Sequence, residues 1–131
     1  MGKLTDTEKV LIGEAASEGE EGMYHAASVM VNRARKHKTT TDKEANRPFQ
    51  FSARMRTDLD KFVGKQPPET VEAARRAIKR ANESPASDAD HYMTNKLYND
   101  KKKRPSWSND MDVVGVVGKH TFLRSRPKKR K

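Results

Sequence analysis

The chain has 131 residues, of which 33% are hydrophobic and 35% are charged, so it has room for one domain with a small core. It contains no cysteine, which excludes disulfide bonds and thiolate metal sites. The formal net charge is +10, and the six basic residues from Arg124 onward leave only 10 − 6 = +4 for the rest. Such a charge favours polyanions as partners: nucleic acid, anionic lipid or acidic envelope polymers.

Residues 1–124 are predicted to form one domain, and residues 125–131 are predicted to be a disordered basic tail because they offer nothing to bury. The first residues lack the apolar stretch of a secretory signal, and no segment is apolar over the length of a membrane span. We therefore expect a protein that is made in the cytoplasm. If its target lies outside the membrane, another protein must release it.

The first part of the chain is predicted to be helical. Thr5 and Glu8 have the spacing of a capping box, which would start a first helix that ends near Gly19. A second helix is predicted over residues 20–36. Its inner face is marked by apolar residues three and four positions apart: Tyr24, Ala27, Val31 and Ala34.

Residues 37–47 are polar and are predicted to be a loop, and a third helix is predicted over residues 54–63. Pro67 and Pro68 then open the clearest helix of the chain. Its apolar stripe consists of Val71, Ala74, Ala77, Ile78 and Ala81.

The last third of the chain is predicted to contain extended segments. Residues 90–93 should be extended, residues 99–104 should form a charged loop, and the β-branched residues between 113 and 123 indicate a small hairpin. The predicted fold class is therefore mainly α with a small β-hairpin (α+β).

Glu14 is the first candidate for chemistry. Val10 and Leu11 lie four and three residues before it, so all three share the apolar face of the first predicted helix. Apolar surroundings favour the neutral form of a carboxyl group, and a glycosidase needs such an acid to protonate the leaving oxygen. The alternative is a partly exposed glutamate at the edge of the stripe.

The residues around Glu14 resemble the cell-wall hydrolases of the spore-cortex-lytic type, the SleB-like family. The resemblance starts with Gly13-Glu14-Ala15, a second glutamate at Glu18, and Gly22 four residues later. Further matching elements follow in order: Asn32-Arg33, Gln50-Phe51-Ser52, His91-Tyr92, Trp107 and Gly118-Lys119-His120-Thr121-Phe122. One element departs from the family: Met93-Thr94-Asn95-Lys96 stands where many members have Asn-Pro.

The resemblance implies a lysozyme-like fold that acts on peptidoglycan. It implies that Glu14 protonates the oxygen between N-acetylmuramic acid and N-acetylglucosamine. In a lytic transglycosylase the same carboxylate then accepts the proton of the muramic acid 6-hydroxyl, and a 1,6-anhydro ring closes. A hydrolytic muramidase is the alternative. Small size and a basic tail further suggest a bacteriophage lysis enzyme whose tail contacts anionic envelope polymers.

The resemblance also indicates supporting residues. Glu18 would tune Glu14 or fix the following loop to the second helix, with a solvated helix-end carboxylate as the alternative. Gln50 and Ser52 would bind the sugar N-acetyl groups or hold Glu14. Tyr92 would stack on a sugar or bond to the carboxyl of Glu14, unless it is a core residue. Trp107 would line the glycan groove or be structural, and His120 would orient the hairpin.

Other classes of function have weaker support. The four histidines are scattered without ligand spacing, so we expect no metal and no cofactor. A basic nucleic-acid-binding module is the alternative function, motivated by the charge and by Lys101-Lys102-Lys103-Arg104. Aromatic residues make up only 6% of the chain and no predicted helix has an uninterrupted basic face, so we expect no specific nucleic-acid partner, and we expect a monomer.

Overall fold

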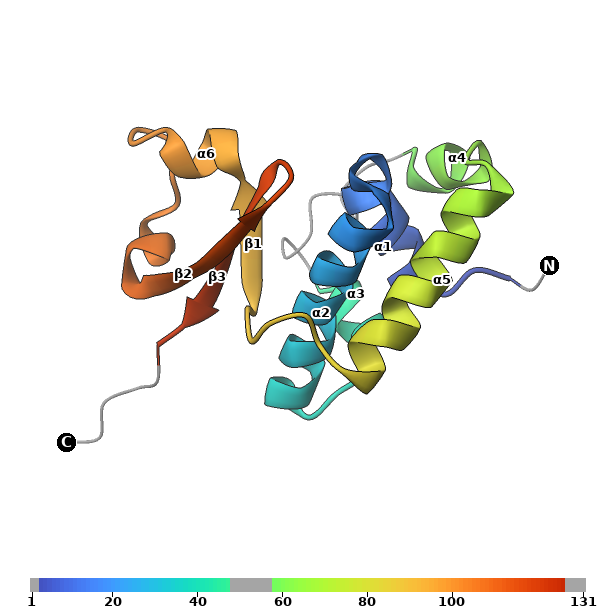
Figure 1. Cartoon of the computed structure of the whole chain (residues 1–131), viewed down its shortest axis with the longest axis horizontal. Helices are drawn as coiled ribbons and strands as arrows, with labels where there is room; N and C mark the ends of the chain where they lie inside the picture. Colours follow the sequence, from blue (N-terminus) through green and yellow to red (C-terminus); the bar gives the residue numbers. More distant parts are fainter. Residues whose placement is uncertain (1–2, 48–57, 127–131) are drawn as a thin grey trace.

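The computed structural model describes residues 3–47 and 58–126. The helices are α1 (Asp6–Ala15), α2 (Gly19–His37), α3 (Thr41–Ala45), α4 (Leu59–Gly64), α5 (Pro68–Glu83) and α6 (Asn95–Asn99), with 3-10 turns at Ala16–Glu18 and Ser106–Asp110. The strands are β1 (His91–Thr94), β2 (Met111–Val117) and β3 (His120–Ser125). Helices α1 to α5 form one body and the three strands stand beside it (Figure 1).

Helix α1 begins as predicted. The Thr5 hydroxyl accepts a hydrogen bond from the backbone N–H of Glu8, and the Glu8 side chain accepts one from the backbone N–H of Thr5. The predicted end near Gly19 is wrong, because α1 stops at Ala15 and a 3-10 turn follows. Gly19 has φ 76° and ψ −177°, a conformation that is essentially restricted to glycine. The chain therefore turns sharply between α1 and α2.

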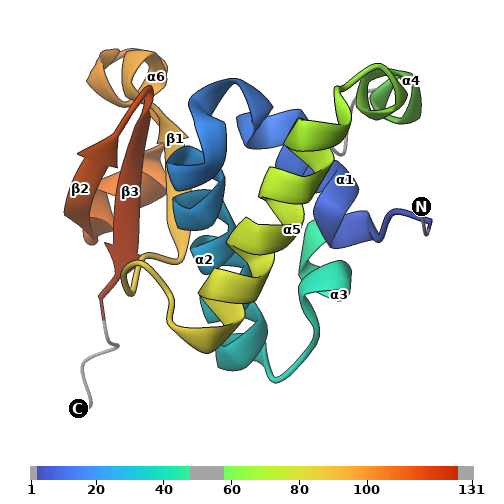
Figure 2. The same cartoon turned by 45° about the vertical axis from the view of Figure 1, so that its right-hand side comes forward.

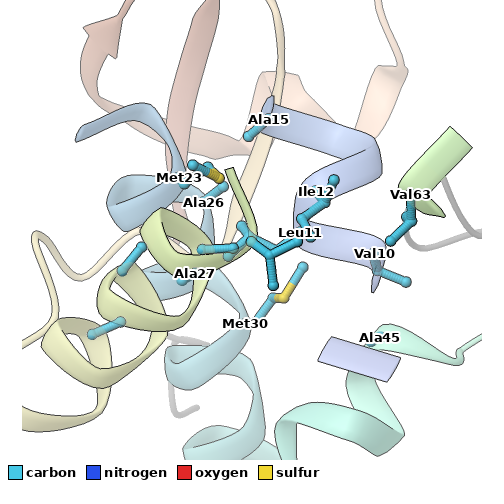
Figure 3. Packing of buried hydrophobic residues seen from close by; sticks show 14 of the residues in the cluster. Val10, Leu11, Ile12, Ala15, Met23, Ala26, Ala27, Met30, Ala45 and Val63 are labelled. Atoms are coloured by element: carbon cyan, nitrogen blue, oxygen red, sulfur yellow. The ribbon is translucent and has the colours of Figure 1, made fainter. Parts of the chain in front are cut away.

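Helix α2 is the central element of the helical body. It confirms the second predicted helix, and α1, α3 and α5 all pack against it. The core cluster joins side chains of α1, α2, α3, α4 and α5, and Leu11, Ile12 and Met30 have no exposed surface. Figure 3 shows Leu11 of α1 next to Met30 of α2 within this cluster. Burial of such apolar side chains is the main force that holds these helices together.

The predicted loop at residues 37–47 is wrong in part, because α3 occupies Thr41–Ala45. The Thr40 hydroxyl caps this helix by accepting a hydrogen bond from the Lys43 N–H. Glu44 of α3 is completely buried and forms ion pairs with Arg33, His37 and Arg47. This polar segment therefore packs on the helical body through the buried Ala45, through Glu44, and through hydrogen bonds from Thr7 to Asp42.

Two helices follow in the second half of the helical body. The described part of the third predicted helix is α4, whereas residues 54–57 lie outside the described residues. Helix α5 confirms the prediction and starts at Pro68. It lies along α2, as Figure 2 shows. Arg76 and Arg80 pair with Glu20 and Glu21 at the start of α2, and Arg80 also lies 3.9 Å above the Tyr24 ring.

The strands form an antiparallel sheet in the order β1-β3-β2. The hairpin of β2 and β3 confirms the prediction, and the extended segment at residues 90–93 becomes the edge strand β1. Tyr92 pairs with Phe122, and Phe122 packs with Val29 of α2 and Ala89. Tyr92 and Phe122 therefore lie on the side of the sheet that faces the helices. The short helix α6 after β1 was not predicted.

The end of the sheet is joined to α2 by polar contacts. The Asn32 side-chain amide donates hydrogen bonds of 2.8 Å to the carbonyls of Ser87 and Ala89, just before β1. Strand β3 continues to Ser125, and Arg126 pairs with Asp112 of β2. The prediction of disorder is therefore wrong for Ser125 and Arg126, because both residues find partners on the sheet. Residues 127–131 lie outside the described residues.

Candidate active site

Glu14 lies in the last turn of α1, at the edge of the helical core. Val10 and Leu11 on the same helix are completely buried, whereas Glu14 is only partly buried. The Tyr92 hydroxyl donates a hydrogen bond of 2.9 Å to Glu14 Oε1. Glu14 thus follows the buried residues of its own helix, and its carboxyl group accepts a hydrogen bond from a phenol of β1. The sequence places Glu14 near apolar residues of its own helix. The fold adds the hydrogen bond from Tyr92, which lies 78 residues further along the chain.

Tyr92 is positioned by two aromatic neighbours on β3. Its ring stacks on Phe122 with the centroids 5.5 Å apart, and the His120 ring meets it edge to face at 5.3 Å. Burial raises the pKa of the Tyr92 phenol well above its usual value, and the negative charge of Glu14 and the hydrogen bond to it raise this pKa further. Tyr92 therefore stays a neutral hydrogen-bond donor to Glu14 over the physiological pH range.

Glu18 holds the turn of the hairpin. Its Oε1 accepts a hydrogen bond of 2.7 Å from the Lys119 backbone N–H and one of 3.0 Å from His120 Nδ1. The side chains of Glu18 and His120 are only 10% and 15% exposed, so this contact is largely shielded from solvent. The prediction that Glu18 and Glu14 share one continuous helix is wrong, because α1 ends at Ala15.

Two glycines make room for Glu18. A Cβ atom at Gly22 would lie 2.3 Å from the Glu18 Cβ, and one at Gly118 would lie 2.9 Å from Glu18 Oε1. Gly118 also has φ 56°, which favours glycine in the hairpin turn. The spacing of Glu18 and Gly22 in the sequence therefore has a packing reason. The link between Glu18 and Gly118 could not be read from the sequence, because it depends on how the sheet docks.

Trp107 lies on the opposite side of the sheet. Its ring contacts His91 with the centroids 5.1 Å apart. His91 precedes Tyr92 in β1, and neighbouring side chains of a strand point to opposite faces. The structure thus brings Tyr92, His120 and Glu18 toward Glu14 but places Trp107 on the outer face of the sheet. Gln50 and Ser52, also predicted site residues, lie outside the described residues.

Asn95 contributes to this region, although the sequence analysis predicts no role for it. Its side-chain amide donates to the Gly118 carbonyl at 3.1 Å, and its Oδ1 accepts from the Thr121 hydroxyl at 2.7 Å. Its backbone N–H donates to the Lys119 carbonyl at 2.8 Å. The Thr94 side chain caps the short helix that begins at Asn95. A threonine that can act as an N-cap is the sequence feature that indicates this helix. Asn95 and Glu18 thus hold the hairpin turn from two sides.

The described part of the chain contains no group of three or more His, Asp or Glu side chains arranged to hold a metal ion. Within residues 3–47 and 58–126, no helix combines the length and the hydropathy that crossing a bilayer demands.

Comparison with known proteins assigns the family. The family model described as Cell Wall Hydrolase matches residues 17–123, which is most of the chain. The chain belongs to this family. No curated protein and no solved structure matches it. The cell wall hydrolase therefore acts on peptidoglycan, and its helical body with a small antiparallel sheet is the lysozyme-like fold. The matched region includes Glu18, Tyr92, Trp107 and His120 and begins three residues after Glu14.

Proposed function

We propose that this cell wall hydrolase cleaves the bond between N-acetylmuramic acid and N-acetylglucosamine with Glu14 as general acid and base. The observation that supports this role is the hydrogen bond from Tyr92 to Glu14 at the junction of α1 and β1. This hydrogen bond orients the carboxyl group in the last turn of α1, where it can give and accept a proton. A positioned acid of this kind contributes roughly 10²–10⁴-fold to a reaction rate.

The reaction that we propose is that of a lytic transglycosylase. Glu14 gives its proton to the glycosidic oxygen, the bond from that oxygen to C1 of the muramic acid breaks, and the ring gains oxocarbenium character. The Glu14 carboxylate then takes the proton from the 6-hydroxyl of the same sugar, and O6 forms the new bond to C1. The products are a free 4-hydroxyl and a 1,6-anhydro ring, and Glu14 is protonated again. The nucleophile is already attached, so no water is consumed.

The position of Glu18 supports the single-carboxylate mechanism. Retaining and inverting hydrolases use a second carboxylate opposite the acid. Glu18, the acidic residue that follows Glu14 in the sequence, instead accepts hydrogen bonds from Lys119 and His120 at the hairpin turn. A hydrolytic muramidase, in which water takes the place of the 6-hydroxyl, is the competing proposal for the same site.

Product analysis of the wild type and of Glu14→Gln tests this proposal. The amide keeps the size of the side chain but cannot donate a carboxyl proton, so cleavage of purified peptidoglycan should fall by at least 10²-fold while the circular dichroism spectrum stays unchanged. Mass spectrometry of the wild-type products decides between the two reactions, because anhydro products are one water lighter than hydrolysed ones. Full activity of Glu14→Gln would refute the role of Glu14.

We further propose that the enzyme serves in lysis of a host cell by a bacteriophage, after a membrane-permeabilising partner gives it access to the wall. The basic residues 128–131 would then hold it on anionic envelope polymers. Co-expression with a permeabilising protein should lyse cells when the wild type is present. Co-expression of Glu14→Gln should leave the cells permeable but unlysed, and lysis by that variant would argue against enzymatic cell lysis.

A further inference from the structure

The outer side of the sheet carries apolar side chains that the active site does not use. Val113 pairs with Leu123, and Val116 pairs with Thr121. Leu123 and Thr121 are the neighbours of Phe122 in β3, and Phe122 faces the helices. Val113 and Val116 therefore point away from the helical body. They are 48% and 61% exposed, and Trp107 is 45% exposed. We call Trp107, Val113 and Val116 the outer apolar patch.

The same side of the sheet carries a cluster of positive charge. Asn95, the first residue of α6, bonds to Thr121 and so places α6 on the outer side. The chain then runs through Lys101, Lys102 and Lys103, all exposed, before it reaches Trp107. We call these three residues the lysine loop. Residues 95–119 contain six basic and three acidic residues, which gives 6 − 3 = +3.

The lysine loop has a defined conformation. One carboxylate oxygen of Asp100 accepts hydrogen bonds from the backbone N–H groups of Lys102 and Lys103, at 3.0 and 3.3 Å. Arg104 lies over the Tyr98 ring at 4.9 Å and donates to the Tyr98 carbonyl. Asp112, a second acid of this region, is paired with Arg124 and Arg126. The three lysine side chains are thus exposed on a loop of fixed backbone, four to six residues before Trp107 in the chain.

We propose that the outer apolar patch and the lysine loop form a binding surface for an anionic lipid bilayer. Lysines next to a bilayer are attracted by anionic headgroups, and tryptophan is favoured at the level of those headgroups. The exposed Val113 and Val116 favour a bilayer over a hydrated anionic polymer as the partner. Branched aliphatic side chains gain from contact with acyl chains, whereas a sugar-phosphate polymer offers them no apolar surface. This surface lies apart from Glu14, so the proposal does not depend on the catalytic one.

Trp107 allows a direct test because it is the only tryptophan of the chain. The full chain is mixed with vesicles of phosphatidylcholine alone or with a third of phosphatidylglycerol. We expect co-sedimentation and a blue shift of the tryptophan emission with the anionic vesicles only, and both should weaken as salt rises. Glu14→Gln should bind like the wild type, which separates this test from that of the catalytic role. Absence of binding to anionic vesicles would overturn the proposal.

Matched variants test the surface itself. Replacing the lysine loop by K101Q/K102Q/K103Q should weaken partition into anionic vesicles tenfold or more, since each lysine near such a surface contributes about fivefold. The control removes three exposed lysines from the helical body: K43Q/K65Q/K79Q. It should reduce partition much less. V113T/V116T keeps the shape and β propensity of the valines, and it should reduce both the partition and the blue shift.

Three results would contradict a bilayer surface. Equal losses in the two triple variants would mean that binding reports only net charge. An equal blue shift with polyphosphate in place of vesicles would mean that the surface binds soluble polyanions. A blue shift that grows with protein concentration without vesicles would mean that the patch binds a second copy of the chain.

Discussion

At the scale of single residues, the hydrogen bond between Tyr92 and Glu14 is the contact on which the proposed chemistry depends most. Tyr92→Phe removes the hydroxyl and keeps the ring that packs on Phe122 and His120. We expect kcat on purified peptidoglycan to fall about tenfold, because a hydrogen bond to a carboxyl that loses its donor corresponds to about 1–2 kcal/mol. Steady-state release of soluble fragments measures this.

Tyr24→Phe is a matched control for that variant. The Tyr24 hydroxyl donates to the Ser84 carbonyl, so the change removes the same group from another place in the helical body. Its activity should equal that of the wild type. If both variants lose activity to the same degree, the effect of Tyr92→Phe is one of general stability and Tyr92 does not position Glu14.

The same residues show what the sequence could predict of the site. Glu14 is predicted from two local patterns: Val10 and Leu11 precede it on one helix, and Gly13-Glu14-Ala15 resembles the opening motif of the SleB-like hydrolases. The partners of Glu18 lie 101 and 102 residues further along the chain, so no local pattern indicates them. Trp107 shows the converse: it is a predicted site residue, but its contact with His91 and the alternation of side chains along β1 place it on the face of the sheet away from Glu14.

At the scale of elements, the hairpin turn between β2 and β3 is the most constrained segment of the sheet. Gly118→Ala adds a Cβ atom within 2.9 Å of Glu18 Oε1 at a residue with φ 56°. We expect a loss of about 1–2 kcal/mol in the free energy of unfolding from the backbone conformation alone. Activity should fall as well, because His120 leaves its place against Tyr92 when Glu18 is displaced. Urea denaturation measures the first effect.

Gly115→Ala in β2 is the control for the turn variant. A Cβ atom at Gly115 meets nothing within 4 Å, and its φ does not favour glycine. The unfolding free energy should stay the same or rise by about 0.5 kcal/mol, because alanine restricts the unfolded chain. Equal destabilisation by the two variants would show that neither the backbone conformation of Gly118 nor its contact with Glu18 determines the stability of the turn.

The elements that the sequence predicts correctly are marked by patterns within the segment itself. The elements that it misses depend on contacts with distant parts of the chain. Helix α5 has two prolines at its start and a regular apolar stripe, and it was predicted in full. Helix α3 has five residues and one of them, Ala45, is apolar; it contacts α2 through Glu44, which pairs with Arg33 and His37. Its signal in the sequence was a capping threonine before acidic residues. Strand β1 pairs with β3, about thirty residues further along the chain. No local pattern in the sequence predicts this pairing.

At the scale of the whole molecule, Asp90 joins the helical body to the sheet. It accepts hydrogen bonds from Lys36 of α2 at 3.2 Å, from His91 of β1 at 3.0 Å and from the Ser125 N–H of β3 at 3.0 Å. Burial by itself would raise the pKa of Asp90, but the hydrogen bonds from His91 and Ser125 and the charge of His91 outweigh it. The pKa of Asp90 is therefore held well below its usual value.

This depressed pKa predicts how stability depends on pH. A carboxyl group with a lower pKa in the folded state stabilises the fold above its unfolded pKa of about 3.9, and this contribution is lost as the pH falls toward the folded pKa. At pH 7, Asp90→Asn should lower the free energy of unfolding by about 2 kcal/mol, because charge-assisted hydrogen bonds are lost. The difference from the wild type should shrink as the pH falls from about 4 to about 2, because the Asp90 carboxyl takes up a proton there in the unfolded chain but stays ionised in the folded protein.

Urea denaturation of both proteins across this pH range measures the difference. Asp60→Asn is the control, since Asp60 pairs with Lys9 on the surface with its side chain 81% exposed. That change should stay within about 0.5 kcal/mol at every pH. A gap between the wild type and Asp90→Asn that stays constant down to pH 2 would mean that the charge of Asp90 is not what joins the two parts. The junction would then depend on the apolar contacts of Phe122 with Val29 and Ala89.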